Sequence, residues 1–214
     1  MHANRFRIIS GITVLMLFLV TACSSITGTT STNGSTSATA TSTPQPTATS
    51  VAIPVATISY CEGLLTIAEA NKILNPVNPI VGVQIANSTN NSSCKYTDAS
   101  NNVLLLLNFA PFSSGTQINT AATQYIAQVF NNPNTAIVTS HAVSGVGNQA
   151  WYISSKITGG NISGLAKVLC IAAGGLQITL TNISMNGTGL LSSVSDVVVQ
   201  GEFVQAAALI ISRM

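Results

Sequence analysis

Few side chains in this 214-residue chain can take part in acid–base, nucleophilic or metal chemistry. Charged residues make up 6% of the sequence, against roughly 25% in typical soluble proteins. A catalytic or metal site would have to use the histidines, cysteines and carboxylates beyond the N-terminal segment. These groups are His141, Cys61, Cys94, Cys170, Glu62, Glu69, Asp98, Asp196 and Glu202.

The spacing of these groups matches no catalytic or metal-binding motif. The sequence has no Gly-x-Ser-x-Gly elbow, and no His, Cys and Asp residues stand at the spacing of metal ligands. No two carboxylates are placed so that a local element must bring them together. We therefore predict no catalytic residues, no metal site and no cofactor, and the sequence does not identify the ligand-binding residues.

His141 supports the main alternative. Its side chain is the only one in the mature chain whose unperturbed pKa lies near neutrality. General acid–base catalysis needs such a group, so an envelope hydrolase would use His141 with a hydroxyl or carboxylate partner. The surrounding stretch is rich in Thr and Ser, which favours a polar surface position instead.

The segment Gly145-Val146-Gly147-Asn148-Gln149-Ala150 has the letters of a dinucleotide-binding fingerprint. A strand-like Trp-Tyr-Ile follows it, whereas a pyrophosphate site requires the N-terminus of a helix. The glycines therefore indicate a tight turn.

The N-terminus predicts export. Arg5 and Arg7 precede an apolar stretch of 13 residues, Ile8 to Val20, which is shorter than the approximately 20 residues of a membrane-spanning helix. Thr21-Ala22-Cys23 then resembles the lipobox of bacterial lipoproteins. That resemblance implies cleavage after residue 22 and a diacylglycerol on Cys23.

Residues 23–55 are expected to be a disordered tether that starts at the lipidated cysteine. Residues 24–55 hold no charged side chain, and 17 of these 32 residues are Ser or Thr. Such a composition buries too little apolar surface to offset the entropy of ordering. Residues 56–214 then form a single globular domain.

The domain is predicted to be α+β, with a mainly antiparallel sheet and two or three helices packed on one face. A capping box, Thr66 to Glu69, begins a short helix, and a second one near Ser193 begins the last helix. Helical spacing over 118–129 predicts a further helix. Strands are expected at 81–86, 103–110, 136–138, 150–154, 166–172 and 176–181.

Three cysteines remain in the domain, and an exported protein permits disulfides. Cys61 and Cys94 lie in polar, loop-like settings, whereas Cys170 lies within an apolar strand. We therefore pair Cys61 with Cys94 and expect Cys170 to be a buried thiol. The alternative, a nucleophilic Cys170, would need a low-pKa thiolate beside a base.

Three short motifs together resemble a class of bacterial lipoprotein domains of unknown function, common in actinobacteria. They are Cys61 followed by Leu64-Leu65-Thr66, then Cys94-Lys95-Tyr96, then the glycine turn before Trp151. The resemblance covers residues 59–212 and implies an α+β domain with a disulfide between its first two cysteines. It brings no known activity. Asn148 stands where the class often has an acid, which argues against a metal there.

These features predict a membrane-anchored extracytoplasmic lipoprotein on the outer face of the cell membrane. We expect a non-catalytic domain that binds an envelope protein or a small ligand, with a hydrolase or a structural surface protein as alternatives. Nucleic acid is not an expected partner, because five basic and five acidic residues from Cys23 onward leave no excess positive charge.

The lipid anchor is directly testable. Cys23→Ala should release the protein from membranes or leave an unprocessed precursor, because the acyl group and not a spanning helix holds it. Membrane fractionation with immunoblotting checks this. A variant that is cleaved normally and stays fully membrane-bound would contradict the assignment.

Overall fold

The computed structural model describes residues 60–113, 115–130, 135–159, 162–186, 188–189, 191 and 195–214. The predicted signal segment, Cys23 and the tether lie outside these residues. The described part contains α1 (Cys61–Leu64), α2 (Ile67–Leu74), β1 (Ile80–Asn87), β2 (Ser92–Asp98), β3 (Val103–Pro111), α3 (Ile118–Phe130), β4 (Thr135–Val143), β5 (Gln149–Gly159), β6 (Ile162–Ala173), β7 (Leu176–Met185) and α4 (Asp196–Ser212). The chain is thus α+β, as predicted, with a dominant sheet. The described residues form four helices, where two or three were expected.

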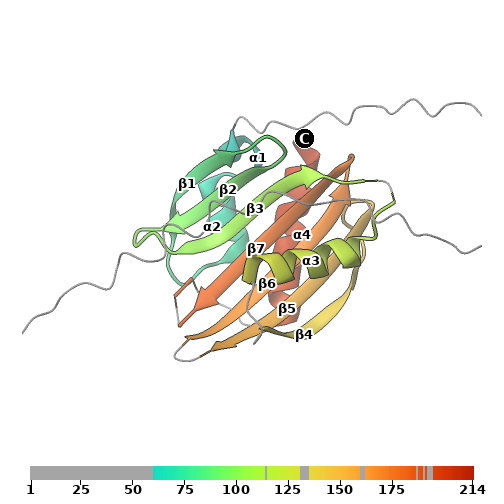
Figure 1. Cartoon of the computed structure of the whole chain (residues 1–214). Coiled ribbons are helices and arrows are strands. Elements are labelled where there is room, and N and C mark those ends of the chain that lie inside the picture. The colour runs from blue at the N-terminus through green and yellow to red at the C-terminus, as the bar shows by residue number, and fades with distance from the viewer. Residues whose placement is uncertain are drawn as a thin grey trace, which may run out of the picture. The chain divides into compact units, whose positions relative to one another are not determined.

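The seven strands form one antiparallel sheet in the order β1-β2-β3-β7-β6-β5-β4 (Figure 1). Consecutive strands pair within β1–β3 and within β4–β7. The pairing of β3 with β7 then joins these two groups, with Leu107 opposite Leu180. β1 and β4 are therefore the two edge strands.

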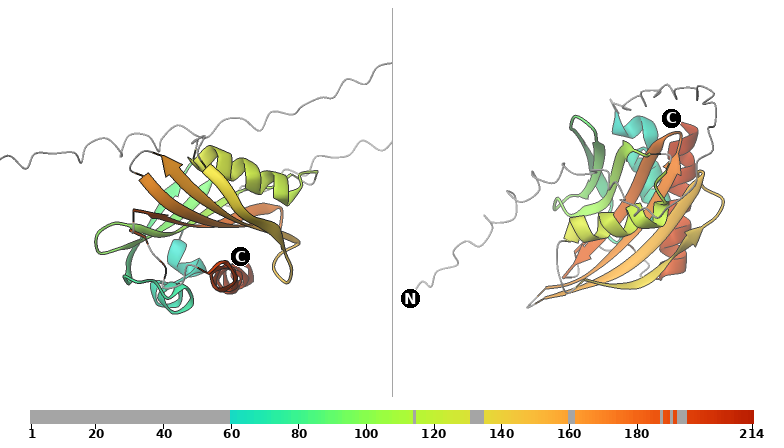
Figure 2. Two further views of the ribbon diagram at one scale, coloured as in Figure 1. Left: turned by 90° about the horizontal axis from the view of Figure 1, so that it is seen from below. Right: turned by 45° about the vertical axis from the view of Figure 1, so that its right-hand side comes forward.

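The helices lie on both faces of the sheet. Figure 2 shows α1, α2 and α4 on one face and α3 on the opposite face. Each face has its own cluster of buried side chains, with Phe203 of α4 in one and Ile126 of α3 in the other. The prediction that the helices pack on one face is therefore wrong for α3.

The residue pattern of β7 explains why α3 was expected on the other face of the sheet. Its alternation of apolar and polar residues predicts one exposed face, yet Thr179 and Thr181 are buried. The Thr181 hydroxyl lies 3.0 Å from the hydroxyl of Tyr125 on α3, and Tyr125 also accepts a hydrogen bond from Asn108 of β3. A threonine that makes such a bond can be covered by a helix at little cost.

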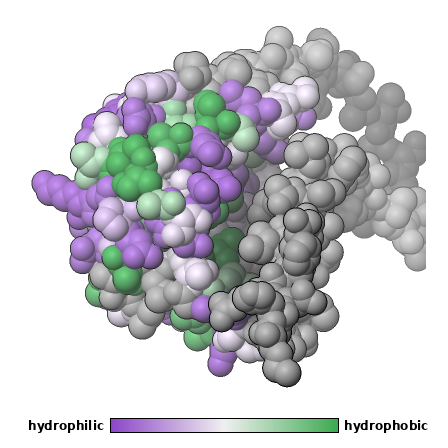
Figure 3. Space-filling view, turned by 90° about the vertical axis from the view of Figure 1, so that its left-hand side faces the viewer, coloured by the Kyte–Doolittle hydropathy of each residue, from purple (hydrophilic) through white to green (hydrophobic). Residues whose placement is uncertain are grey.

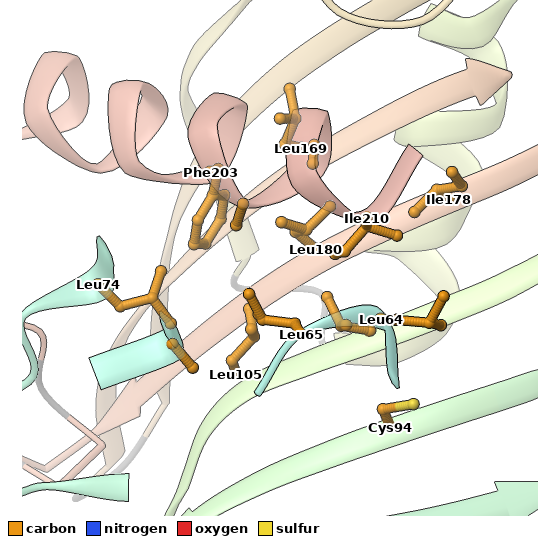
Figure 4. Close-up of a cluster of buried hydrophobic side chains, with 14 of the residues drawn as sticks. Leu64, Leu65, Leu74, Cys94, Leu105, Leu169, Ile178, Leu180, Phe203 and Ile210 are labelled. Atoms are coloured by element: carbon orange, nitrogen blue, oxygen red, sulfur yellow. The ribbon is translucent and has the colours of Figure 1, made fainter. Parts of the chain in front are cut away.

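The larger core lies between α4, the first two helices and the sheet. Phe203 and Ile210 of α4 are fully buried, and they face Leu105, Leu169 and Leu180 of three central strands (Figure 4). Burial of a leucine or phenylalanine contributes about 1.5–3 kcal/mol.

None of the described helices is long and apolar enough to cross a membrane.

The first predicted capping box is present, and the second begins outside the described residues. The Thr66 side chain accepts from the Glu69 amide, and the Glu69 carboxylate accepts from the Thr66 amide. At the other predicted box, Ser193 lies outside the described residues. The helix begins at Asp196, and its N-cap Ser195 makes no capping hydrogen bond.

The glycine motif forms the β4–β5 turn, as expected. Gly147 has a φ of 60°, and a Cβ added there would lie 2.7 Å from the carbonyl oxygen of Ala172. The amide of Asn148 donates to that same oxygen over 2.7 Å. Glycine is thus needed for close packing of the turn against the end of β6, and no helix N-terminus follows.

The predicted disulfide joins Cys61 to Cys94, with Cα atoms 5.6 Å apart. The loop-like settings predicted for these residues are wrong, because Cys61 begins α1 and Cys94 is fully buried within β2. Cys170 is the buried free thiol that was predicted, and burial raises its pKa to about 12. That pKa is incompatible with a thiolate nucleophile.

The disulfide should contribute strongly to stability. Its two cysteines are 33 residues apart. Cys94→Ser, with Cys61→Ser, should lower the free energy of unfolding by about 4 kcal/mol in the chain-entropy model. Urea unfolding measures this loss.

Alkylation provides the control for the disulfide. In the wild-type protein Cys61 and Cys94 should resist alkylation until reduction, and Cys170 should react only after unfolding. A peptide map with Cys170 bridged to either partner would contradict both assignments.

Candidate functional site

A polar row crosses the face of the sheet that α4 covers, beneath the start of that helix. Thr139, Ser154, Lys167 and Asn182 lie directly opposite one another on β4, β5, β6 and β7. In the next row toward the core, Leu169 and Leu180 take the corresponding places on β6 and β7. The sheet thus changes from apolar to polar where the last helix begins.

Asp196, the first residue of α4, is the centre of this polar group. Its carboxylate accepts from the Thr139 hydroxyl over 2.9 Å and from the Tyr152 hydroxyl over 3.3 Å. The Lys167 ammonium lies 3.1 Å from the same carboxylate. Partial burial opposes ionisation, but bonds from Thr139 and Lys167 and the lysine charge outweigh it and lower the pKa of Asp196.

Lys167 is the most deeply placed charge of the group. Its side chain is 5% exposed, whereas that of Asp196 is 28% exposed. Removal of one partner from a buried ion pair typically costs 3–5 kcal/mol, because the other charge stays buried. The pair therefore fixes the N-terminal end of α4 onto β6.

Glu202 adds a second carboxylate two turns along α4. Burial raises its pKa to about 7, and the nearby positive charge of Lys167 only partly opposes this shift. Its Oε2 atom is buried and makes no hydrogen bond to the described residues. The charge of Lys167 thus acts on two acids whose pKa values differ in direction, because the pKa of Asp196 is lowered and that of Glu202 is raised.

His141 lies at the edge of this group on β4. Its Nε2 atom is 2.8 Å from Oε1 of Gln200 on α4, so the tautomer protonated at Nε2 donates to this amide. The imidazole also packs against the Tyr152 ring, with centroids 5.7 Å apart. The ring nitrogen is thus engaged by a neutral amide rather than by a carboxylate or nucleophile.

Two other acids hold local structure. Asp98 accepts from the side chain and backbone of Asn102 and from the Ser100 amide, which lowers its pKa and closes the β2–β3 turn. Glu69 binds Arg213 through two nitrogens, and these bonds, with those from Thr66, lower its pKa to about 2.

Sequence reasoning did not find the polar group around Asp196. One signal was available: Lys167 interrupts the apolar run Leu165-Ala166-Lys167-Val168-Leu169. A lysine in a buried strand requires a partner, since an unpaired buried charge is too costly. The identity of that partner depended on how α4 returns to the sheet.

The described residues contain no group of three or more His, Cys, Asp or Glu side chains that could hold a metal ion. No protein-family model and no curated protein matches this chain. The resemblance to lipoprotein domains of unknown function therefore stays a prediction.

Glu202 predicts a specific pH dependence of stability. Its folded pKa of about 7 lies above the ordinary value of 4.5, so its contribution weakens as pH rises from about 4.5 to 7. The free energy of unfolding of Glu202→Gln should therefore rise relative to that of wild type between pH 5 and pH 8, whatever constant difference separates the two proteins at pH 5. Because the side chain is partly exposed, we expect a gain of about 1 kcal/mol rather than the full shift.

Urea unfolding of wild type and variant at pH 5 and pH 8 measures this difference. Gln205→Glu, which places a carboxylate on the exposed side of the same helix, is the matched control and should not show it. An equal effect of Glu202→Gln at both pH values would contradict the raised pKa.

Proposed function

We propose that this chain is a lipid-anchored protein of the cell envelope whose folded domain acts by binding rather than by catalysis. Cys23 carries the acyl anchor, and the Ser/Thr-rich segment 24–55 holds the domain away from the membrane on the extracytoplasmic side. The ligand is an envelope protein. The Cys61–Cys94 disulfide supports export, because disulfides persist in oxidising compartments.

The engagement of the ionisable groups supports binding over catalysis. Asp98, Glu69 and Asp196 hold turns and helix ends, and His141 bonds to an amide. A general base must instead face a substrate proton. The Cys170 thiol has no exposed surface.

The observation that carries the proposal is a group of exposed apolar side chains where β4 meets the start of α4. Val138 is 63% exposed and Val197 is 81% exposed, with Ile137 and Val198 beside them in sequence. The Thr139–Asp196 hydrogen bond ties these two segments together. We call these four residues the β4–α4 surface.

β4 also offers backbone groups to a partner. It is an edge strand, and its nine residues, Thr135–Val143, include no charged residue and no proline. Natural edge strands commonly carry such residues to prevent pairing with other chains. The pairing of β4 with β5 shifts register between Ile137 and Thr139. An extended segment of a partner protein can therefore add to β4 over residues 139–143, past this irregularity, with its apolar side chains on the β4–α4 surface.

The β1 edge provides a comparison surface. Hydrophobic groups lie among hydrophilic ones on this side of the molecule (Figure 3), and its exposed apolar residues include Val81 and Ile85. The exposed fraction of Val81, 58%, is similar to the 63% of Val138. A lysine at either position meets similar solvent but a different edge of the sheet.

The binding proposal predicts unequal effects of lysine at the two edges. Val138→Lys and Val197→Lys should each reduce recovery of the partner from native membranes at least tenfold, because a charge must be desolvated in the interface. Val81→Lys should not. Cross-linking of the full-length tagged protein in a deletion strain, followed by quantitative mass spectrometry, measures recovery.

His141→Ala separates binding from the hydrolase alternative. In the same strain it should leave the phenotype nearly unchanged, with folding checked by circular dichroism. Loss of the phenotype in a folded His141→Ala protein would favour the hydrolase. Equal recovery of all bound proteins by Val138→Lys and wild type would contradict the β4–α4 surface.

A further inference from the structure

We infer that Lys167 and Asp196 become joined by an intramolecular amide bond between β6 and α4. Lys167 Nζ lies 3.1 Å from Asp196 Oδ1, and the lysine side chain is 5% exposed. Reaction of an amine with a carboxyl group requires close approach with water largely excluded from the amine. Both conditions hold at this pair.

The surrounding contacts hold the two reactants in place. Thr139 donates to Oδ2 of Asp196, and Tyr152 donates to Oδ1, so the carboxyl group is fixed from both sides. Lys167 projects from the middle of a sheet strand that is paired on both sides. Such fixation of neighbouring groups gives effective molarities of roughly 10⁵–10⁸ M in well-oriented intramolecular reactions.

The reaction balances without any co-reactant. The ammonium loses a proton, and the Nζ lone pair attacks the Asp196 carboxyl carbon to form a tetrahedral intermediate. A carboxyl oxygen then leaves with two protons as water, and the C–N bond remains as an amide. The ammonium and carboxylate together become one amide and one water, with no change of oxidation state.

Glu202 supplies a proton carrier for these transfers. Its carboxyl group lies close enough to Lys167 to feel the lysine charge, and one of its oxygens is buried without a hydrogen bond to the described residues. Its pKa of about 7 lets it accept and return a proton near neutral pH. This role also accounts for a partly buried acid that otherwise lowers stability.

Asn182 is the competing acceptor, because it stands directly opposite Lys167 on β7. Its amide nitrogen already donates to the carbonyl oxygens of Leu104 and Gly189, at 2.7 and 3.0 Å. The geometry therefore favours Asp196. The two reactions differ in mass, since one releases water and the other releases ammonia.

Peptide mass spectrometry of the full-length protein tests the bond. Trypsin cleaves after Lys156 and Arg213 but not after an acylated Lys167, so residues 157–213 should remain one peptide. Its mass should be lower by roughly 18 Da, for one lost water. Fragmentation should place the link between Lys167 and Asp196.

Variants identify the groups required. Lys167→Arg preserves the charge but should abolish the mass loss, and Lys156→Arg on β5 is the matched control that should retain it. Glu202→Gln should reduce the linked fraction at least tenfold in freshly produced protein. These readouts come from the covalent mass, so they do not depend on any binding activity.

Three results would overturn the inference. The first is complete cleavage after Lys167 in the wild-type protein with no mass loss. The second is a loss of roughly 17 Da, which indicates an amide made from asparagine. The third is a link that fragmentation places on Glu202. The wild-type peptide decides each case even if a variant does not fold.

Discussion

The register of α4 on the sheet is the constraint on which the larger core depends. α4 carries apolar residues on all sides, from the exposed Val197 to the buried Phe203, so hydrophobic burial alone does not choose its rotation. Polar contacts at the two ends of α4 fix this rotation. Asp196 binds Lys167 at the first residue, and Arg213, just past the last, binds Glu69 and the carbonyl oxygen of Leu64. With both ends fixed, one stripe of the helix meets the strands.

The same constraint explains where polar and apolar groups lie outside the core. The row from Thr139 to Asn182 places polar groups under the first turn of α4, and most of the buried side chains on the rest of that face are apolar. The rotation set by Asp196 also turns Val197 outward. The exposed apolar surface beside β4 is therefore a consequence of the ion pair below it, and disruption of the pair would change both.

Local signals predicted the features that depend on neighbouring residues. The Thr66 capping box and the turn at Gly147 each follow from contacts within a few residues or from backbone geometry. The position of α3 did not, because Thr179 and Thr181 look exposed until Tyr125 covers them. The partner of Lys167 was likewise hidden, since Asp196 is 29 residues away and reaches it only when the helix packs. These contacts join residues far apart in the sequence, so they depend on how the chain folds back on itself. The periodicity of apolar residues within one helix or strand does not predict them.

Because charged residues are scarce in this domain, the environment of each acidic side chain can be compared directly. A chain with only five acids has few spare groups, and Asp98, Glu69 and Asp196 each receive several hydrogen bonds that stabilise the ionised form. Glu202 differs, because burial raises its pKa and the folded state disfavours its charge. A leucine or glutamine would fill that side of α4 at lower cost. Glu202 thus lowers the stability of the folded domain once it ionises, and the positive charge of Lys167 only partly offsets that cost.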